Sequence, residues 1–138
     1  MKSKIIKIPG PASQLSASLE LPVDGKICAY AIFAHCFTCS SDLGVVRHIS
    51  RALTQDNIAV VRFDFTGLGK SEGDFSATNF SSNVEDLIHV AKYMEENYEA
   101  PKILIGHSLG GAAILQAASH LEGINALITI GAPSNPAH

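Results

Sequence analysis

Short apolar segments of strand length alternate with longer segments of helical period along this 138-residue chain, and this alternation constrains the fold more than any other feature. Ala126–Ile130 is predicted to be the last strand. The segments Ala29–Ala34 and Ile58–Phe63 are apolar almost throughout, which is typical of strands covered on both faces. A shorter apolar run over 103–105 predicts one more such strand. Helices are expected over 41–55, 80–98 and 110–121. The alternation predicts an α/β protein, with a mostly parallel sheet and helices on both faces.

The N-terminal part of the chain predicts an antiparallel start to that sheet, with strands over 5–8 and 15–21. Within the second strand, apolar residues alternate strictly with polar ones, Leu15, Ala17, Leu19 and Leu21 with Ser16, Ser18 and Glu20. This alternation indicates a half-buried strand, with one face in the core and one face in water.

The segment 80–98 carries the clearest helical pattern of the chain. Its apolar residues fall on one stripe: Phe80, Val84, Leu87, Ile88, Ala91 and Met94. Ser82 and Glu85 have the spacing of a capping box, which predicts how the start of this helix is satisfied.

The segment Gly106-His107-Ser108-Leu109-Gly110 has the Gly-x-Ser-x-Gly spacing of a nucleophile elbow, in which a serine sits on a sharp turn between a strand and a helix. Here the pattern follows a predicted strand directly and precedes a predicted helix. Larger side chains at Gly106 and Gly110 would collide with neighbouring backbone in such a turn. We therefore interpret Ser108 as the candidate nucleophile and His107 as a packing residue. An ordinary strand–turn–helix with a serine cap is the alternative.

Acyl transfer at a serine also requires two backbone N–H groups that stabilise the oxyanion of the tetrahedral intermediate. In an elbow of this kind one donor belongs to the residue after the nucleophile, which is Leu109 here. The other donor is expected from the loop that follows the strand Ala29–Ala34.

That loop, His35-Cys36-Phe37-Thr38-Cys39-Ser40, resembles the His-Gly-Phe-x-Gly-Ser loop of α/β-hydrolases of the esterase and serine-aminopeptidase type, with both glycines replaced by cysteine. Asp64 with Gly67-x-Gly69-x-Ser71 is similar to the family's loop at the pocket edge, and the elbow fits as well. The similarity covers essentially the whole chain, and it is greatest to the bacterial hydrolase domain often fused to a C-terminal OsmC-like peroxidase domain.

This resemblance implies a three-layer α/β-hydrolase-type sheet, of which residues 1–138 are the N-terminal portion of a single domain, cut after the sixth strand. It also implies hydrolysis of an ester, thioester or amide of a small-molecule acyl substrate, through an acyl intermediate on Ser108. The N–H groups of Phe37 and Leu109 match the family's oxyanion donors.

This sequence offers no suitable acid or histidine to complete a catalytic triad with Ser108. In this fold they come after the serine, as an acid and then a histidine. After Ser108 the chain offers Glu122, His120 and His138. His120 and Glu122 lie about twelve residues along the outgoing helix, roughly 18 Å from the serine. We expect the acid and the histidine from segments beyond residue 138, and weak or no activity for this chain alone.

A non-catalytic binding or assembly module is therefore the second hypothesis. The strand Ala126–Ile130 would be an exposed apolar edge without a further strand beside it, and such edges pair with other chains. We expect self-association, or capture of a partner fragment, through this edge.

Three further patterns in the loops offer alternatives to the hydrolase interpretation. Cys36 and Cys39 have the spacing of a redox dithiol, close to a helix start that would lower a thiol pKa, and this remains a third hypothesis. His35 with both cysteines is too few ligands for a structural zinc site, so no metal is expected. The run Gly67-Leu68-Gly69-Lys70-Ser71 ends like a phosphate-binding loop, but Asp64 stands where the first glycine of that motif is required.

Composition excludes other classes of partner. A formal net charge of −3 does not favour nucleic acid, which selects for an excess of Lys and Arg. No apolar run approaches the length of about 20 residues that a membrane span needs. Three cysteines in a chain of this size favour a reduced, cytoplasmic setting. No cofactor is expected.

Overall fold

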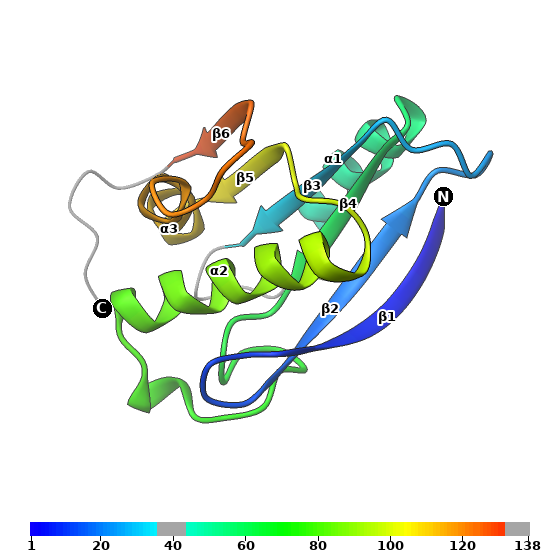
Figure 1. Ribbon diagram of the computed structural model, residues 1–138. Helices are drawn as coiled ribbons and strands as arrows, with labels where there is room; N and C mark the ends of the chain where they lie inside the picture. The colour runs from blue at the N-terminus through cyan, green and yellow to red at the C-terminus, as the bar shows by residue number, and fades with distance from the viewer. Residues whose placement is uncertain (36–43, 132–138) are drawn as a thin grey trace.

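The computed structural model describes residues 1–35 and 44–131. Within these residues the chain forms one sheet of six strands in the order β1-β2-β4-β3-β5-β6 (Figure 1). The strands are β1 (Lys2–Pro9), β2 (Gln14–Leu21), β3 (Ala29–Ala34), β4 (Ile58–Phe63), β5 (Ile103–His107) and β6 (Ala126–Ile130). The helices are α1 (Gly44–Gln55), the 3-10 turn η1 (Phe75–Ala77), α2 (Phe80–Asn97) and α3 (Leu109–Ala118).

The sheet is parallel in its second half and antiparallel at its start, as the sequence predicts. β1 pairs with β2 and β2 with β4 in antiparallel register, whereas the pairs β3–β4, β3–β5 and β5–β6 are parallel. The observed bounds of β3, β4 and β6 are those predicted. The last helix is shorter than predicted, because α3 ends at Ala118 and the chain continues in turns.

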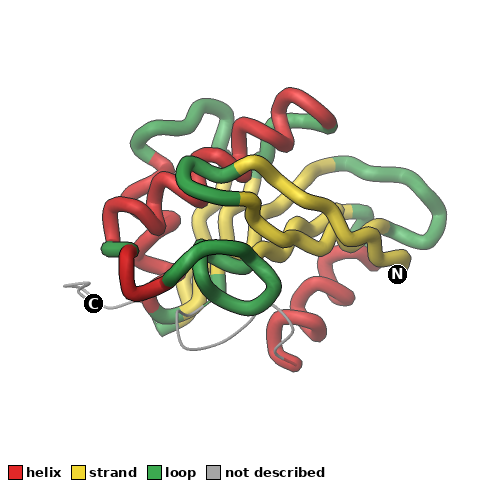
Figure 2. The backbone as a smooth tube through the Cα atoms, turned by 90° about the horizontal axis from the view of Figure 1, so that it is seen from below, coloured by secondary structure: helices red, strands yellow, loops and turns green. Residues whose placement is uncertain are grey.

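Helices cover both faces of the sheet, which confirms the predicted three layers. Figure 2 shows the strands between α1 on one side and α2 on the other. α1 shares a smaller apolar core with Ala31, Phe33, Val60 and Ile105. α2 and α3 share the larger core with the opposite side chains of the same strands, among them Ile32, Val61, Phe63 and Leu104. Each central strand is therefore buried on both faces, which explains its continuous apolar sequence.

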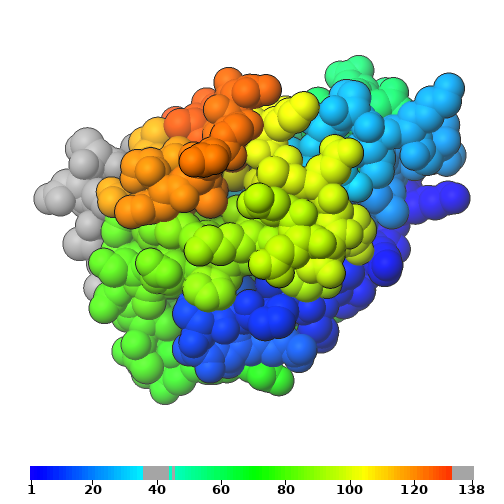
Figure 3. Space-filling view, viewed as in Figure 1, coloured from blue at the N-terminus to red at the C-terminus, as the bar shows by residue number. Residues whose placement is uncertain are grey.

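α2 begins with a capping box one turn earlier than predicted. The side chain of Asn79 accepts the N–H of Ser82, and the hydroxyl of Ser82 accepts the N–H of Asn79. The pairing predicted between Ser82 and Glu85 was wrong, because a shorter hydroxyl can close the same reciprocal pair from the third helical position. The predicted apolar stripe does face the core, and α2 crosses the front of the molecule between the N-terminal hairpin and the segment of α3 and β6 (Figure 3).

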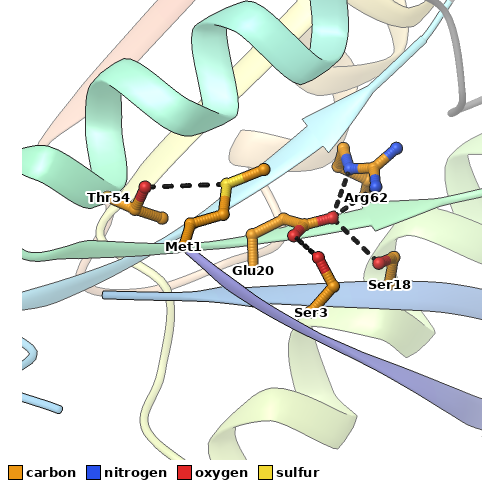
Figure 4. A network of polar contacts seen from close by, with 6 residues as sticks. All are labelled: Met1, Ser3, Ser18, Glu20, Thr54 and Arg62. Carbon is orange, nitrogen blue, oxygen red and sulfur yellow. Dashed lines mark hydrogen bonds and ion pairs between the residues drawn. The ribbon is translucent and has the colours of Figure 1, made fainter. Parts of the chain in front are cut away.

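The polar face of β2 is not in water, which corrects the half-buried prediction for this strand. Ser16, Ser18 and Glu20 are all buried, and Glu20 is completely so. Its carboxylate accepts hydrogen bonds from Arg62 of β4, from Ser3 of β1 and from Ser18, at 2.9 Å for the hydroxyl of Ser18 (Figure 4). The flanking strands therefore supply polar partners that replace water, and strict alternation alone does not distinguish the two environments.

This network controls the ionisation of Glu20. Burial raises the pKa of its carboxyl, but the hydrogen bonds from Ser3, Arg62 and Ser18 and the charge of Arg62 together bring that pKa below its ordinary value of 4.5. A carboxyl with a lowered pKa in the folded state stabilises the fold above the pKa of the unfolded chain. This contribution is lost as the pH falls through the lower, folded pKa.

We expect Arg62→Met to lower the free energy of unfolding by about 3–5 kcal/mol, because it leaves a buried carboxylate without its cation. Urea unfolding at neutral pH measures the loss. The double variant Glu20→Leu with Arg62→Met should recover most of it, since an apolar pair of similar volume needs no counter-charge. A double variant no more stable than Arg62→Met alone would contradict this account of the network.

Candidate active site

Ser108 joins β5 to α3 at the carboxyl ends of the parallel strands, and Figure 1 shows β5 leading into α3. Its backbone has φ 57° and ψ −122°, a combination that non-glycine residues rarely adopt. Three backbone hydrogen bonds hold it there: the N–H of Ser108 donates to the carbonyl of Ile130 at 2.8 Å, and its carbonyl accepts the N–H groups of Gly111 at 2.9 Å and Ala112 at 3.3 Å. The side chain makes no cap hydrogen bond to the helix that it precedes. A strained serine that does not cap its helix argues against an ordinary serine cap.

The two elbow glycines stand where no side chain fits. A Cβ on Gly106 would lie 2.4 Å from the carbonyl oxygen of Gly110 and 2.5 Å from Cα of Gly111. A Cβ on Gly110 would lie 2.2 Å from the carbonyl oxygen of Ala34 and 2.4 Å from that of His35. The first turn of α3 thus packs directly on the backbone at the end of β3, which brings Ala34 and His35 beside the elbow.

Of the two predicted oxyanion donors, the structure describes one, Leu109. Leu109 is the first residue of α3, where a backbone N–H has no acceptor inside the helix. Phe37 lies outside the described residues, as do Cys36 and Cys39 of the dithiol hypothesis and the terminal His138. The described part of the site therefore consists of Ser108, Leu109 and the two glycines.

A buried His–Asp pair also lies at the carboxyl ends of the strands, and this pair was not predicted from the sequence. Asp64 follows β4 directly and is 5% exposed, whereas His35 follows β3 and is fully buried. Oδ1 of Asp64 lies 3.4 Å from Nε2 of His35. Asp64 was expected only as part of the loop at the pocket edge. The sequence does contain a signal for this pair, because each of two neighbouring strands is followed at once by an ionisable residue.

Other ionisable residues near the elbow in sequence are not brought to Ser108. His120 and Glu122 come after the end of α3 and are exposed to a greater degree than the elbow. His107 is half-buried at the end of β5, consistent with the packing role expected for it. Among residues 1–35 and 44–131, no group of three His, Cys, Asp or Glu side chains is arranged to hold a metal ion. None of the helices described is long and apolar enough to cross a membrane.

Comparison with known proteins identifies the family of this chain. The profile of the family described as serine aminopeptidase, S33, matches residues 26–138. The chain belongs to this family. Its sheet and helices are those of the α/β-hydrolase fold, and the family likeness runs through the elbow and the loops around it.

Two solved structures illustrate the likeness. The esterase domain of a Rhodothermus marinus protein is 49% identical, with a TM-score of 0.81, and the match covers 99% of this chain and 52% of that one. An α/β serine hydrolase without a lid from Xanthomonas campestris is 30% identical, with a TM-score of 0.84, over 98% of this chain and 63% of that one.

Among curated relatives, the mitochondrial palmitoyl-protein thioesterase ABHD10 of Rattus norvegicus is 33% identical over 78 residues, which are 56% of this chain and 25% of that protein. The monoglyceride lipase of Rattus norvegicus is 33% identical over 85 residues, which are 59% of this chain and 28% of the lipase. The chain thus spans between half and two thirds of the two solved structures, and the match covers about a quarter of these curated relatives.

We expect Ser108→Gly to raise the free energy of unfolding by about 1 kcal/mol, because glycine adopts this backbone conformation without the clash of a Cβ. Ser108→Ala is the matched control: it removes the hydroxyl but keeps the Cβ, so it should leave stability nearly unchanged. Thermal or urea unfolding of the three proteins makes the comparison. A glycine variant less stable than the alanine variant would show that the serine conformation carries no strain.

Proposed function

We propose that this chain carries the nucleophile half of a serine-hydrolase site that cleaves an ester, thioester or amide through an acyl intermediate on Ser108. The conformation of Ser108 is the observation that carries the proposal. Holding Ser108 in this strained conformation, on a turn closed by two glycine contacts, costs free energy. A role as the nucleophile, at the carboxyl ends of the parallel strands, accounts for that cost.

The proposed reaction begins when a histidine base takes the proton from the hydroxyl of Ser108, and Oγ attacks the carbonyl carbon of the substrate. The N–H groups of Leu109 and Phe37 stabilise the oxyanion that forms. The intermediate then collapses, the base protonates the leaving alcohol, thiol or amine, and Ser108 is left acylated. Water, activated by the same base, attacks the acyl carbon, releases the acid and restores the serine.

The base and its orienting acid are proposed to lie beyond residue 138. His120 and Glu122 do not reach the elbow, and the solved esterase domain is about twice as long as the part that this chain matches. The match runs over nearly the whole chain, which supports residues 1–138 as one N-terminal portion of a single hydrolase domain. Without the missing groups, the oxyanion donors and binding alone leave a residual acceleration of about 10³–10⁴ over water.

The substrate is proposed to be a small acyl compound. The relatives whose names state an activity are a thioesterase, a lipase and esterases, which all release an acyl group from oxygen or sulfur. A cytoplasmic setting is proposed from the cysteine content, and the proposed reaction needs no cofactor. The OsmC-like fusion partner suggested by the sequence stays a prediction.

We expect Ser108→Ala to reduce hydrolysis of p-nitrophenyl acetate by the complete gene product by about 10⁴-fold or more, because it removes the attacking oxygen. A fluorophosphonate probe should label the wild type at Ser108 and leave the variant unlabelled. Ser119→Ala, at the exposed far end of α3, is the control and should keep wild-type activity. Equal rates for the wild type and Ser108→Ala would refute the proposed function.

Assembly through β6 is the second candidate function, and the exposure of that strand favours it. β6 pairs with β5 at the edge of the sheet, and Leu127, Ile128 and Ile130 are 41%, 45% and 37% exposed. Because successive side chains alternate across a strand, both faces of β6 expose apolar groups. An apolar edge of this kind recruits another strand, from a second copy of this chain or from a partner fragment.

We expect residues 1–138 to self-associate, and Ile128→Lys to weaken that association at least about tenfold, because a charge on the edge opposes strand pairing. Sedimentation velocity over a range of concentrations measures the change. Ile5→Lys is the matched control, since Ile5 is also exposed but lies on β1 at the opposite edge. A wild type that stays monomeric at every concentration would rule out this second function.

A further inference from the structure

The carboxylate of Asp64 is held more tightly than that of an ordinary surface residue. Its Oδ2 accepts the N–H of Lys70 at 3.1 Å, and the backbone of Gly69 wraps so closely that a Cβ there would lie 2.4 Å from the carboxylate. Its own backbone is also fixed: the N–H donates to Ser16 at 3.0 Å and the carbonyl accepts the hydroxyl of Ser71. The side chain therefore has one position, set by β2 and by the loop after β4.

The other carboxylate oxygen faces His35. Oδ1 lies 3.4 Å from Nε2 of His35, and the imidazole ring stands edge-on to Phe65 with 5.6 Å between the ring centres. His35 is fully buried, so its ring is surrounded by protein atoms. A carboxylate beside a buried imidazole fixes the orientation of that ring.

The backbone of His35 in turn lies against Gly110 of the elbow. The carbonyl oxygens of Ala34 and His35 are the atoms that leave no room for a Cβ on Gly110. Gly110 is two residues from Ser108, and the neighbouring Gly111 donates its N–H to the carbonyl of Ser108. A shift at His35 is therefore transmitted through close-packed backbone to the turn that carries the serine.

We propose that Asp64 is a positioning residue for the nucleophile: through His35 it fixes the end of β3 against the first turn of α3, and so the place of Ser108. As a statement about reactivity, this inference rests on the proposed function, in which Ser108 is the attacking group. It assigns Asp64 no contact with substrate. A displacement of about 1 Å in a reacting group costs on the order of 100-fold in rate, so such a residue affects turnover more than binding.

Asp86 provides a matched control that contacts the same loop. It is also a buried carboxylate, and it accepts the N–H of Thr66 at 2.8 Å and the hydroxyl of Thr66 at 3.0 Å. Burial raises the pKa of its carboxyl, so it too is sensitive to its surroundings. However, Asp86 belongs to α2, and among the described residues it hydrogen-bonds to Thr66 and not to His35 or the elbow. A loss of stability alone should be common to variants of both residues, whereas a change at the elbow should be specific to Asp64.

Hydrogen exchange of the backbone amides of Ser108 and Gly111 tests the positioning without requiring activity. We expect Asp64→Asn and His35→Leu each to speed their exchange at least about tenfold, because the elbow opens locally. Asp86→Asn should stay within about threefold of the wild type. His35→Gln should do so as well, because its amide group can keep a polar contact with Asp64. The double variant Asp64→Asn with His35→Leu should be no faster than the faster single variant, since both act through one contact.

Activity provides the second measurement, made on the complete gene product. Asp64→Asn should lower kcat for p-nitrophenyl acetate by about 10–100-fold with KM changed less than about threefold, and Asp86→Asn should leave both near wild type. Equal exchange at the elbow in Asp64→Asn and Asp86→Asn, or additive effects in the double variant, would overturn the inference. If Asp64→Asn does not fold, the contrast between His35→Leu and His35→Gln decides in the same way. An unlabelled Ser108 combined with the expected exchange pattern would refute the proposed function and leave the positioning of the elbow standing.

Discussion

The close approach of α3 to the end of β3 is the contact on which the rest of this edge depends. Gly110 lies against the carbonyl oxygens of Ala34 and His35, and Gly106 lies against the first turn of the same helix. Neither approach leaves space for a methyl group, so the helix leaves the strand in one direction only. That direction sets the backbone of Ser108, and it places the first turn of α3 beside Ala34 and His35 at the end of β3. The chemistry proposed for this edge is thus a consequence of packing between two short backbone segments.

The fold was predictable because its signals are local. β3, β4 and β6 read as apolar runs of strand length, α2 as a single apolar stripe, and the turn at Ser108 as a pattern confined to five residues. The two errors that concern burial share one cause, which is polar pairing between residues distant in sequence. Glu20 is buried because Ser3 and Arg62 meet it on neighbouring strands, and Asp64 is buried beside His35. Neither pairing has a spacing rule, since each depends on the register of the sheet.

Both polar pairs lie along the same face of the sheet, the one that α1 covers. The register Ala34 opposite Phe63 and Ser18 opposite Arg62 places the His35–Asp64 pair at the carboxyl ends of the strands, with Arg62 and Glu20 further down. The opposite face, under α2 and α3, is packed by apolar side chains. The face under α2 and α3 therefore contributes the larger apolar core, and the face under α1 combines a smaller apolar core with hydrogen bonds whose geometry fixes how neighbouring strands lie against each other.

β6 contacts the elbow on its inner side and is exposed on its outer side. The carbonyl of Ile130 accepts the N–H of Ser108, so the inner side of β6 helps to hold the turn of the serine. Its outer side is the exposed apolar edge of the sheet. A strand added to that edge would pair with β6 and restrain the position of Ile130, and with it the backbone of Ser108. Covering the edge and ordering the elbow are therefore coupled: whatever polypeptide pairs with β6 also contributes to the geometry of the candidate nucleophile, even if it supplies no side chain to the reaction.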